Sequence, residues 1–161
     1  MKFQLSSQIH APVDVVWAFH ERPDILDILT PPWQPVQVIR REGGLGPGAI
    51  SEFRLWLGPF PLTWLAQHTD EYDPGRLFTD IQVSGPVESW THRHRFIPQA
   101  PQTQGNQTQA PQTQLVDDIT FELPISVLSE PLIGAFVNQR LEDMFRYRHQ
   151  QTKRYCESQG H

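Results

Sequence analysis

Hydrophobic and polar positions alternate along two segments in the second half of the chain, 89–98 and 115–123. Strand side chains point alternately to opposite faces. One face of each segment is rich in charged residues, so we expect that face to meet water. The opposite face points inward and carries polar residues among large apolar ones: Trp90, His92, His94, Phe96, Leu115, Asp117, Ile119, Phe121 and Leu123. Because an unpartnered polar group in a dry core costs several kcal/mol, the pattern predicts a partly hollow, wet interior that holds a ligand.

The same alternation, broken by turns rich in glycine and proline, predicts five more strands, at 2–9, 34–41, 49–57, 62–69 and 76–83. Two short helices fit between the first two strands, since Pro12 and Pro23 suit the first turn of a helix. After Pro124 the hydrophobic period becomes helical, which predicts a long helix over 129–154 capped by Ser129. Its predicted buried stripe is Ile133, Val137, Leu141 and Phe145.

Residues 98–114 differ in kind from the rest of the chain. They are rich in glutamine, proline and threonine, and the pentapeptide Ala-Pro-Gln-Thr-Gln occurs twice. Apart from its prolines, the segment has no apolar side chain larger than alanine, so it has nothing to bury. We therefore expect one domain over 1–161 with a flexible hairpin insertion at 98–114.

Composition narrows the classes of partner and compartment. Charged residues make up 19% of the chain and the net charge is −5, with no basic run, which argues against a nucleic-acid partner. No apolar stretch approaches the length of a membrane span, and the N-terminal segment lacks the apolar core of a signal peptide. With Cys156 as the single cysteine, a reducing compartment fits best. We expect a cytoplasmic protein.

The predicted order is one strand, two short helices, six strands and a long C-terminal helix. Together with Ile9-His-Ala-Pro-Val-Asp-Val-Val-Trp17 at the first junction, this order resembles the START / pollen-allergen-like (SRPBCC) superfamily over essentially the whole chain. It is most similar to the bacterial ligand-binding branch that is grouped with polyketide cyclase/dehydrase-like proteins. The stretches that match this branch are 20–23, 29–33, 78–82, 85–86, 90–96 and 146–149.

The resemblance implies an α+β helix-grip fold. In that fold a curved antiparallel sheet of about seven strands wraps around the long C-terminal helix, with two short helices after the first strand. It also implies a cavity between the sheet and the helix. It brings no metal.

The inward polar residues are the candidates for chemistry. Two histidines and Asp117 could form a polar wall of a cavity, a hydrogen-bonded structural cluster, or a metal site. We favour the polar wall and predict no metal or cofactor, because the neighbouring interior residues are bulky and aromatic. The predicted ligand-binding residues are Trp90, His92, His94, Asp117, Trp64, His68, Asp80, Gln82, Phe136, Arg140 and Met144.

Two of these assignments are left open by the pattern. Burial alone would turn Asp80 and Gln82 to water, whereas an odd-length turn before Glu88 would place them beside His92. Arg140 is either a cation inside, meeting Asp117 or an acidic ligand, or a surface residue next to Asp143.

The resulting hypothesis is that the protein binds a small, largely hydrophobic or aromatic molecule between the sheet and the last helix. One alternative is an enzyme of the cyclase or dehydratase type, in which an inward His/Asp pair serves as acid and base. A second alternative is a protein-interaction module with a collapsed cavity.

Overall fold

The computed structural model describes residues 1–101, 103–104, 107–108, 110–124 and 131–158. Its elements follow the predicted order: β1 (Lys2–Ile9), α1 (Val13–His20), α2 (Ile25–Leu29), β2 (Val36–Glu42), β3 (Ile50–Leu57), β4 (Phe60–Asp73), β5 (Leu77–Ser84), β6 (Ser89–Gln99), β7 (Thr103–Gln104), β8 (Gln107–Thr108), β9 (Gln112–Glu122) and α4 (Pro131–Glu157). No helix among these described residues is long and apolar enough to cross a membrane.

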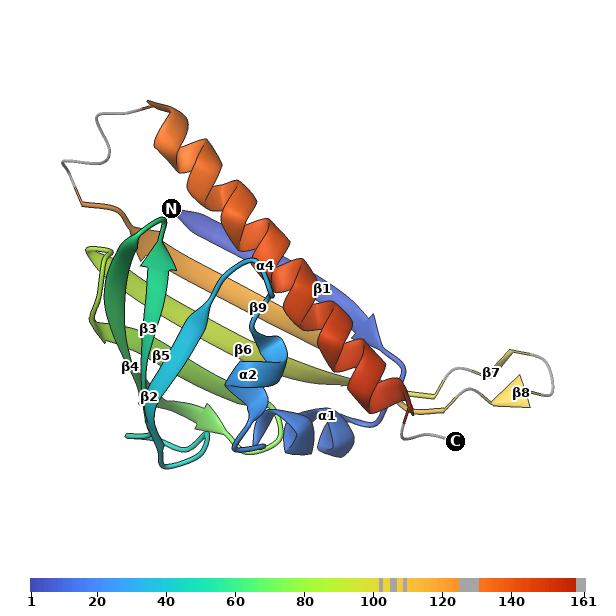
Figure 1. Cartoon of the computed structure of the whole chain (residues 1–161). Coiled ribbons are helices and arrows are strands. Elements are labelled where there is room, and N and C mark those ends of the chain that lie inside the picture. The colour runs from blue at the N-terminus through green and yellow to red at the C-terminus, as the bar shows by residue number, and fades with distance from the viewer. Residues whose placement is uncertain (102, 105–106, 109, 125–130, 159–161) are drawn as a thin grey trace.

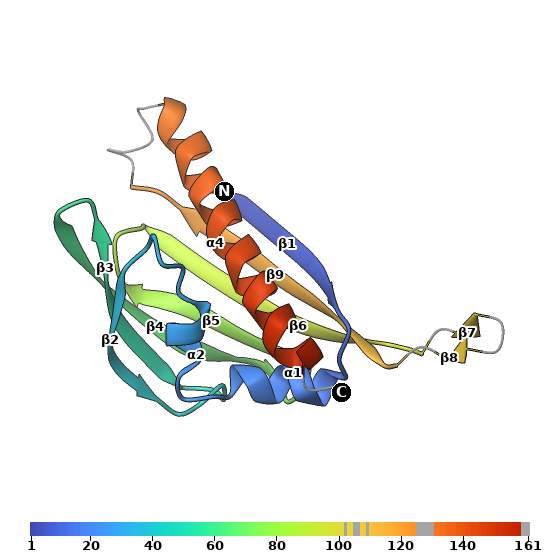
Figure 2. The same cartoon turned by 45° about the vertical axis from the view of Figure 1, so that its right-hand side comes forward.

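Seven strands form one antiparallel sheet in the order β1-β9-β6-β5-β4-β3-β2. The sheet curves, and α4 runs diagonally along the side of it that carries β1 and β9 (Figure 1). The helix packs mainly against β1, β9, α1 and α2, which leaves the β2–β5 half of the sheet without a long helix over it among the described residues (Figure 2). This arrangement confirms the predicted α+β helix-grip fold.

The core consists of two clusters of buried side chains. The first joins α1 and α2 to the sheet, and Trp17 meets Phe78 and Phe96 there in edge-to-face contacts. The second lies under the first half of α4, where Leu141 and Phe145 are buried against Ile119, Phe121 and Leu123. Ile133 and Val137 pack on the second cluster, so the predicted helix stripe is confirmed. Residues 129–130, with the predicted cap Ser129, lie outside the described residues.

Near the insertion, β6 and β9 run longer than predicted, to Gln99 and from Gln112. Beyond them β7 and β8 form a separate two-stranded pair that projects past the end of the main sheet (Figure 1). Residues 102, 105–106 and 109 lie outside the described residues. That residues 1–161 form one domain with a flexible insertion at 98–114 stays a prediction.

Candidate binding site and its polar network

Strand pairing brings the predicted polar residues together on the inner face of the sheet. The register of β6 and β9 sets His94 opposite Asp117, and the register of β5 and β6 sets Asp80 opposite His92. Opposite residues in an antiparallel pair share a face. The orientation that the sequence left open is therefore settled for β5: Asp80 and Gln82 lie on the inner face.

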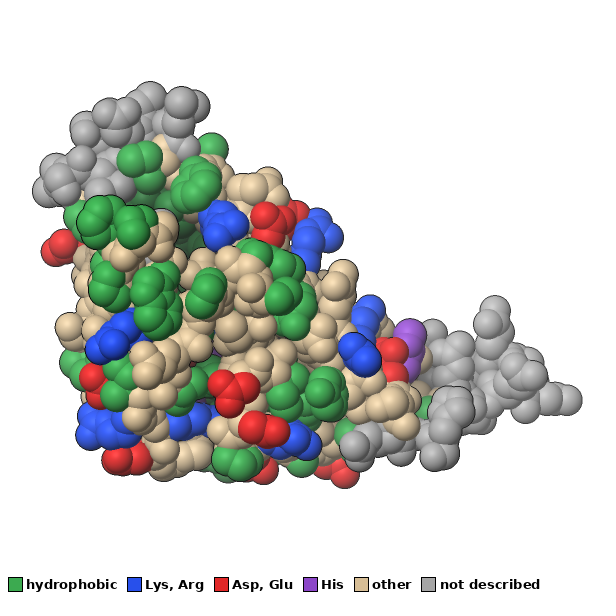
Figure 3. All heavy atoms as spheres, in the orientation of Figure 1, with side chains coloured by type: hydrophobic (Ala, Val, Ile, Leu, Met, Phe, Trp, Pro, Cys, Tyr) green, Lys and Arg blue, Asp and Glu red, His purple; other side chains and the backbone are tan. Residues whose placement is uncertain are grey.

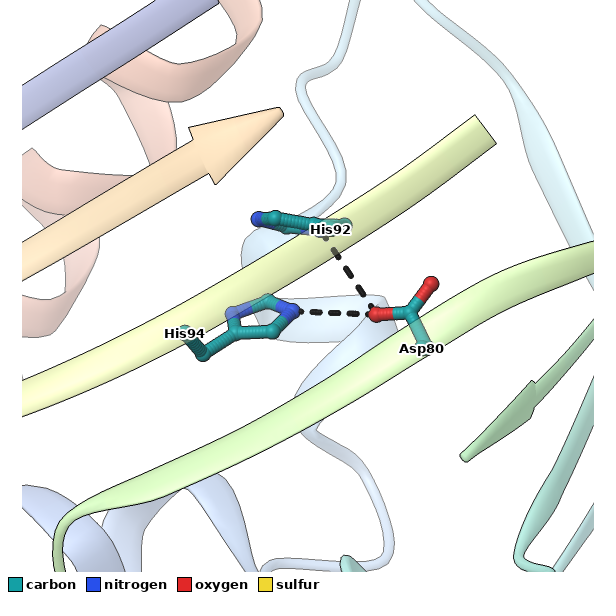
Figure 4. Close-up of side chains that lie close together, drawn as sticks. All are labelled: Asp80, His92 and His94. Carbon is teal, nitrogen blue, oxygen red and sulfur yellow. Dashed lines mark hydrogen bonds and ion pairs between the residues drawn. The ribbon is translucent and has the colours of Figure 1, made fainter. Parts of the chain in front are cut away.

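Asp117 is the centre of a hydrogen-bond network. Its Oδ1 lies 2.8 Å from Nε2 of His92 and 2.9 Å from Nδ1 of His94, and its Oδ2 accepts from Nε2 of His149 at 2.6 Å. On the other side of the two β6 histidines, Oδ2 of Asp80 lies 3.1 Å from Nε2 of His94 and 3.6 Å from Nδ1 of His92 (Figure 4). Two carboxylates and two imidazoles thus alternate around a closed ring.

This environment shifts the protonation equilibria of the ring. Burial alone would raise the pKa of Asp117, but the hydrogen bonds from His149, His92 and His94 outweigh it and hold that pKa well below its ordinary value. Burial would likewise lower the pKa of His94, yet its bonds to Asp117 and Asp80 raise it. Burial and the neighbouring His94 together lower the pKa of His92. The ring therefore favours ionised carboxylates, and His94 holds a proton more readily than His92.

Three residues of this interior were not among the predicted site residues: His20, His149 and Arg148. His149 joins α4 to β1 as well as to β9, because Ser7 Oγ lies 2.8 Å from its Nδ1. The Arg148 guanidinium lies 5.1 Å from the centre of the Phe145 ring, and its Nε is buried without a hydrogen-bond partner. Burial lowers the pKa of the Arg148 guanidinium, and the nearby carboxylates of Asp117 and Asp80 partly offset this.

A small cavity lies beside the network. Its volume is about 20 Å³, and its lining includes His20, Arg148 and Thr152 as well as His94, Asp117 and His149. That volume suits one water molecule and is far below the roughly 300–1,000 Å³ of ligand pockets. A ligand-sized hollow at the polar network is therefore not confirmed. Burial lowers the pKa of His20 to about 4, so this histidine is neutral in the folded protein near pH 7.

Large aromatic side chains continue from the network toward the uncovered half of the sheet. Trp90 meets Trp64 edge-on with 5.1 Å between ring centres, and Trp64 stacks on Phe53 at 6.0 Å. All three rings are only partly buried. Hydrophobic side chains gather on this side of the molecule, over the ends of β3 and β4 and over the first turns of α4 (Figure 3).

His68 and Gln82 face inward but have local partners. The Nδ1 of His68 lies 2.8 Å from the carbonyl oxygen of Leu45, which ties the glycine-rich loop to β4. The ring of His68 stacks on Phe78, which in turn stacks on His94. The amide of Gln82 donates to the carbonyl oxygen of Val87 and braces the turn between β5 and β6. A ligand role for these two residues stays a prediction.

The residues predicted from the helix divide between the core and the surface. Met144 packs on the second core cluster, whereas Phe136 is 57% exposed. Arg140 is also exposed, and its Nη2 donates to Oε1 of Gln34 at 3.3 Å. Arg140 lines an open surface groove of about 380 Å³ with Trp33, Asp143, Arg146, Tyr147 and Gln150.

The sheet, the long helix and the inward polar network together define a helix-grip protein. Sequence comparison identifies the family within this class. Residues 9–146 match the family described as "Polyketide cyclase / dehydrase and lipid transport", so the chain belongs to that family. The family associates this fold with ligand binding or polyketide cyclase-like activity. Comparison with curated proteins gave no match.

Solved structures confirm the fold. The chain is similar to part of a nucleoside-diphosphate sugar epimerase from Corynebacterium glutamicum, with 26% identity and a TM-score of 0.63 over 94% of this chain and 28% of the epimerase chain. It is also similar to StfQ, a di-domain ARO/CYC protein of the steffimycin biosynthetic pathway, with 16% identity and a TM-score of 0.66 over 98% of this chain and 51% of StfQ. Ara h 8.0201 matches with 12% identity and a TM-score of 0.59 over 98% of both chains.

Proposed function

We propose that this protein binds a small, largely hydrophobic molecule against the inner face of β3–β6, with the polar end of the molecule at Asp80 and His94. The observation that carries the proposal is the run of partly exposed aromatic rings, Phe53, Trp64 and Trp90, that ends at the polar ring. Large aromatic side chains gain from burial, and a flat apolar molecule would cover them.

The position of α4 supports this placement. The helix packs mainly on β1, β9, α1 and α2, so within the described part of the chain the aromatic face of β3 and β4 has no helix packed closely on it. Phe136 lies on the exposed side of α4, and Phe60, 68% exposed, begins β4. Apolar side chains that flank an uncovered apolar face are typical of a binding site.

Polar groups at one end would fix the orientation of the ligand. Asp80 and His94 each keep 14% of the side chain exposed, whereas His92 and Asp117 keep 5% and 6%. A carbonyl or hydroxyl group of the ligand would therefore meet Asp80 and His94 first. The same two groups are an acid–base pair, which keeps a cyclase or dehydratase activity as the alternative function.

Native mass spectrometry of gently purified protein, followed by titration with the fluorescent apolar probe anilinonaphthalene sulfonate, tests the proposal. We expect a bound small molecule or saturable probe binding. Trp64→Ala should weaken probe binding by about tenfold or more, as expected for losing one large apolar contact. Val83→Ala is the matched control, because Val83 is 54% exposed on the opposite face of the sheet.

Equal probe affinity for wild type and Trp64→Ala would contradict the proposed location. A copurifying protein in place of a small molecule would favour the interaction-module alternative. If an enolisable polyketide-like compound is converted by the wild type and not by Asp80→Asn, the protein is an enzyme of the alternative class.

A further inference from the structure

We propose that Asp80, His92 and His94 form a binding site for a divalent transition-metal cation of the Zn²⁺ or Fe²⁺ type, with Asp117 orienting both imidazoles. The inference goes beyond ligand binding and does not depend on it, since the cation alone is the ligand. It starts from the fact that one nitrogen of each β6 histidine and one oxygen of Asp80 lie within 4.8 Å of one another.

The separations of these donor atoms suit a single cation. Oδ2 of Asp80 lies 3.1 Å from Nε2 of His94 and 3.6 Å from Nδ1 of His92. A cation bonded to nitrogen and oxygen ligands at about 2.0–2.2 Å holds neighbouring donors roughly 3–3.5 Å apart in tetrahedral or octahedral geometry. In Figure 4 both imidazoles present a nitrogen to the same carboxylate oxygen.

Hydrogen bonds with Asp117 direct the lone pairs of both histidines toward Asp80. An ionised carboxylate is an acceptor only, so His92 donates through Nε2 and His94 through Nδ1, at 2.8 and 2.9 Å. Histidine binds a cation in its neutral form, and in that form the opposite nitrogen of each ring carries a lone pair directed at Asp80. Metal-binding histidines usually have this arrangement, with the other ring nitrogen donating to a carboxylate.

The surroundings hold the donors in place and still leave access. The His94 ring stacks on Phe78 with 4.0 Å between ring centres, and the His92 ring meets Phe145 edge-on at 5.1 Å. His149 holds the other oxygen of Asp117. Asp80 and His94 keep 14% of their side chains exposed, which gives a cation a path to the site.

Two imidazoles and one carboxylate are three protein ligands, one fewer than in a closed structural zinc site. The remaining coordination positions would be open to water or to an oxygen atom of a small molecule. This donor set of nitrogen and oxygen favours first-row transition metals over Ca²⁺ or Mg²⁺, which prefer oxygen ligands alone.

The test uses the full chain after dialysis against a chelator. Titration with Zn²⁺ by calorimetry and with Co²⁺ by visible absorption should show one bound cation per chain, and Zn²⁺ should raise the Tm. Asp80→Asn keeps the shape of the side chain and should weaken binding by at least about 10- to 100-fold, the range known even for indirect metal contacts. His10→Gln is the matched control, because it removes a surface histidine that pairs with Glu157 at 3.3 Å.

Imidazole resonances in two-bond proton–nitrogen spectra of the wild type give a second readout that needs no variant. We expect Zn²⁺ to shift the signals of His92 and His94 and to leave those of His10 unchanged. The proposal is overturned if the wild type binds no stoichiometric cation, if Asp80→Asn binds as well as the wild type, or if His10→Gln abolishes binding.

Discussion

Replacing His149 by leucine tests whether the polar network holds α4 on the sheet. His149 is 2% exposed, and its Nε2 donates to the ionised carboxylate of Asp117 at 2.6 Å. The leucine has no donor, so Oδ2 of Asp117 loses this partner while Oδ1 keeps its two imidazoles. Ser7 loses an acceptor but is only partly buried, so water can replace it.

The expected cost follows from the one charged hydrogen bond. Bonds to ionised groups contribute about 1.5–3 kcal/mol, and a buried group left unpaired loses a similar amount. Burial of the leucine side chain offsets part of this, so we expect His149→Leu to lower the free energy of unfolding by about 1–3 kcal/mol. For a domain of this size that corresponds to a Tm lowered by roughly 2–12 °C.

Urea unfolding followed by tryptophan fluorescence measures the change. His149→Gln should lose less than His149→Leu, since the amide nitrogen of glutamine reaches nearly the position of Nε2. Gln150→Leu, an exposed neighbour on α4, should stay within about 0.5 kcal/mol of the wild type. A double-mutant cycle with Asp117→Asn should give a coupling energy of about 0.5–3 kcal/mol. A cost below about 0.5 kcal/mol for His149→Leu, with no coupling, would refute the role given to this bond.

Two further predictions concern the core and the pH dependence of stability. Leu141→Ala should lower the free energy of unfolding, measured in urea, by about 2–5 kcal/mol, because Leu141 is 7% exposed within the second core cluster. A loss as small as that of the exposed control Asn138→Ala would mean that the helix is rotated about its axis. His20 has a folded pKa of about 4 against 6.5 for an unfolded histidine, so the unfolded state binds more protons between these values and stability falls as the pH drops from 6.5 toward 4. The loss amounts to about 3 kcal/mol at most. His20→Asn, which keeps a donor for the carbonyl oxygen of Val16, should flatten this part of the profile relative to the wild type, and an unchanged profile would contradict the assignment.

The fold could be predicted because its signals are local. Strand alternation, turns rich in glycine and proline, and the change to helical periodicity after Pro124 each lie within a short stretch of sequence. The inward phase of β6 and β9 was equally readable, since the charged faces of both strands exclude the opposite choice. Pairing then places His94 opposite Asp117, as the shared phase requires.

The orientation of Asp80 depends on the pairing of two strands and not on one short stretch of sequence. Its face is set by how the turn between β5 and β6 places one strand against the other, and the amide of Gln82 braces that turn through Val87. Burial preference alone favoured the wrong face for β5, because Ile81 and Val83 look like core residues but lie exposed.

His149 could have been found by extending the helix stripe. The spacing that links Leu141 and Phe145 reaches His149 after four more residues, and Cys156 continues the same buried side. The predicted hollow is not confirmed at the polar network, because the inference from polarity treated the inward polar groups as unpartnered. His149 and Asp80 come from elements distant in sequence and supply those partners, while Phe145 fills space next to His92.

The network crosses the boundary between the covered and uncovered halves of the sheet, and this position separates two kinds of consequence. Asp117 lies under α4 and His149 belongs to α4, and their side chains are 6% and 3% exposed, so losing either should act mainly on stability. Asp80 lies one strand beyond β6, is more exposed and neighbours the aromatic face. A change at Asp80 should therefore act on the binding of a cation or a polar ligand group more than on folding. Changes at the helix end of the network should therefore lower stability, and changes at the β5 end should lower binding. This difference follows because one carboxylate of the network is buried and the other is accessible.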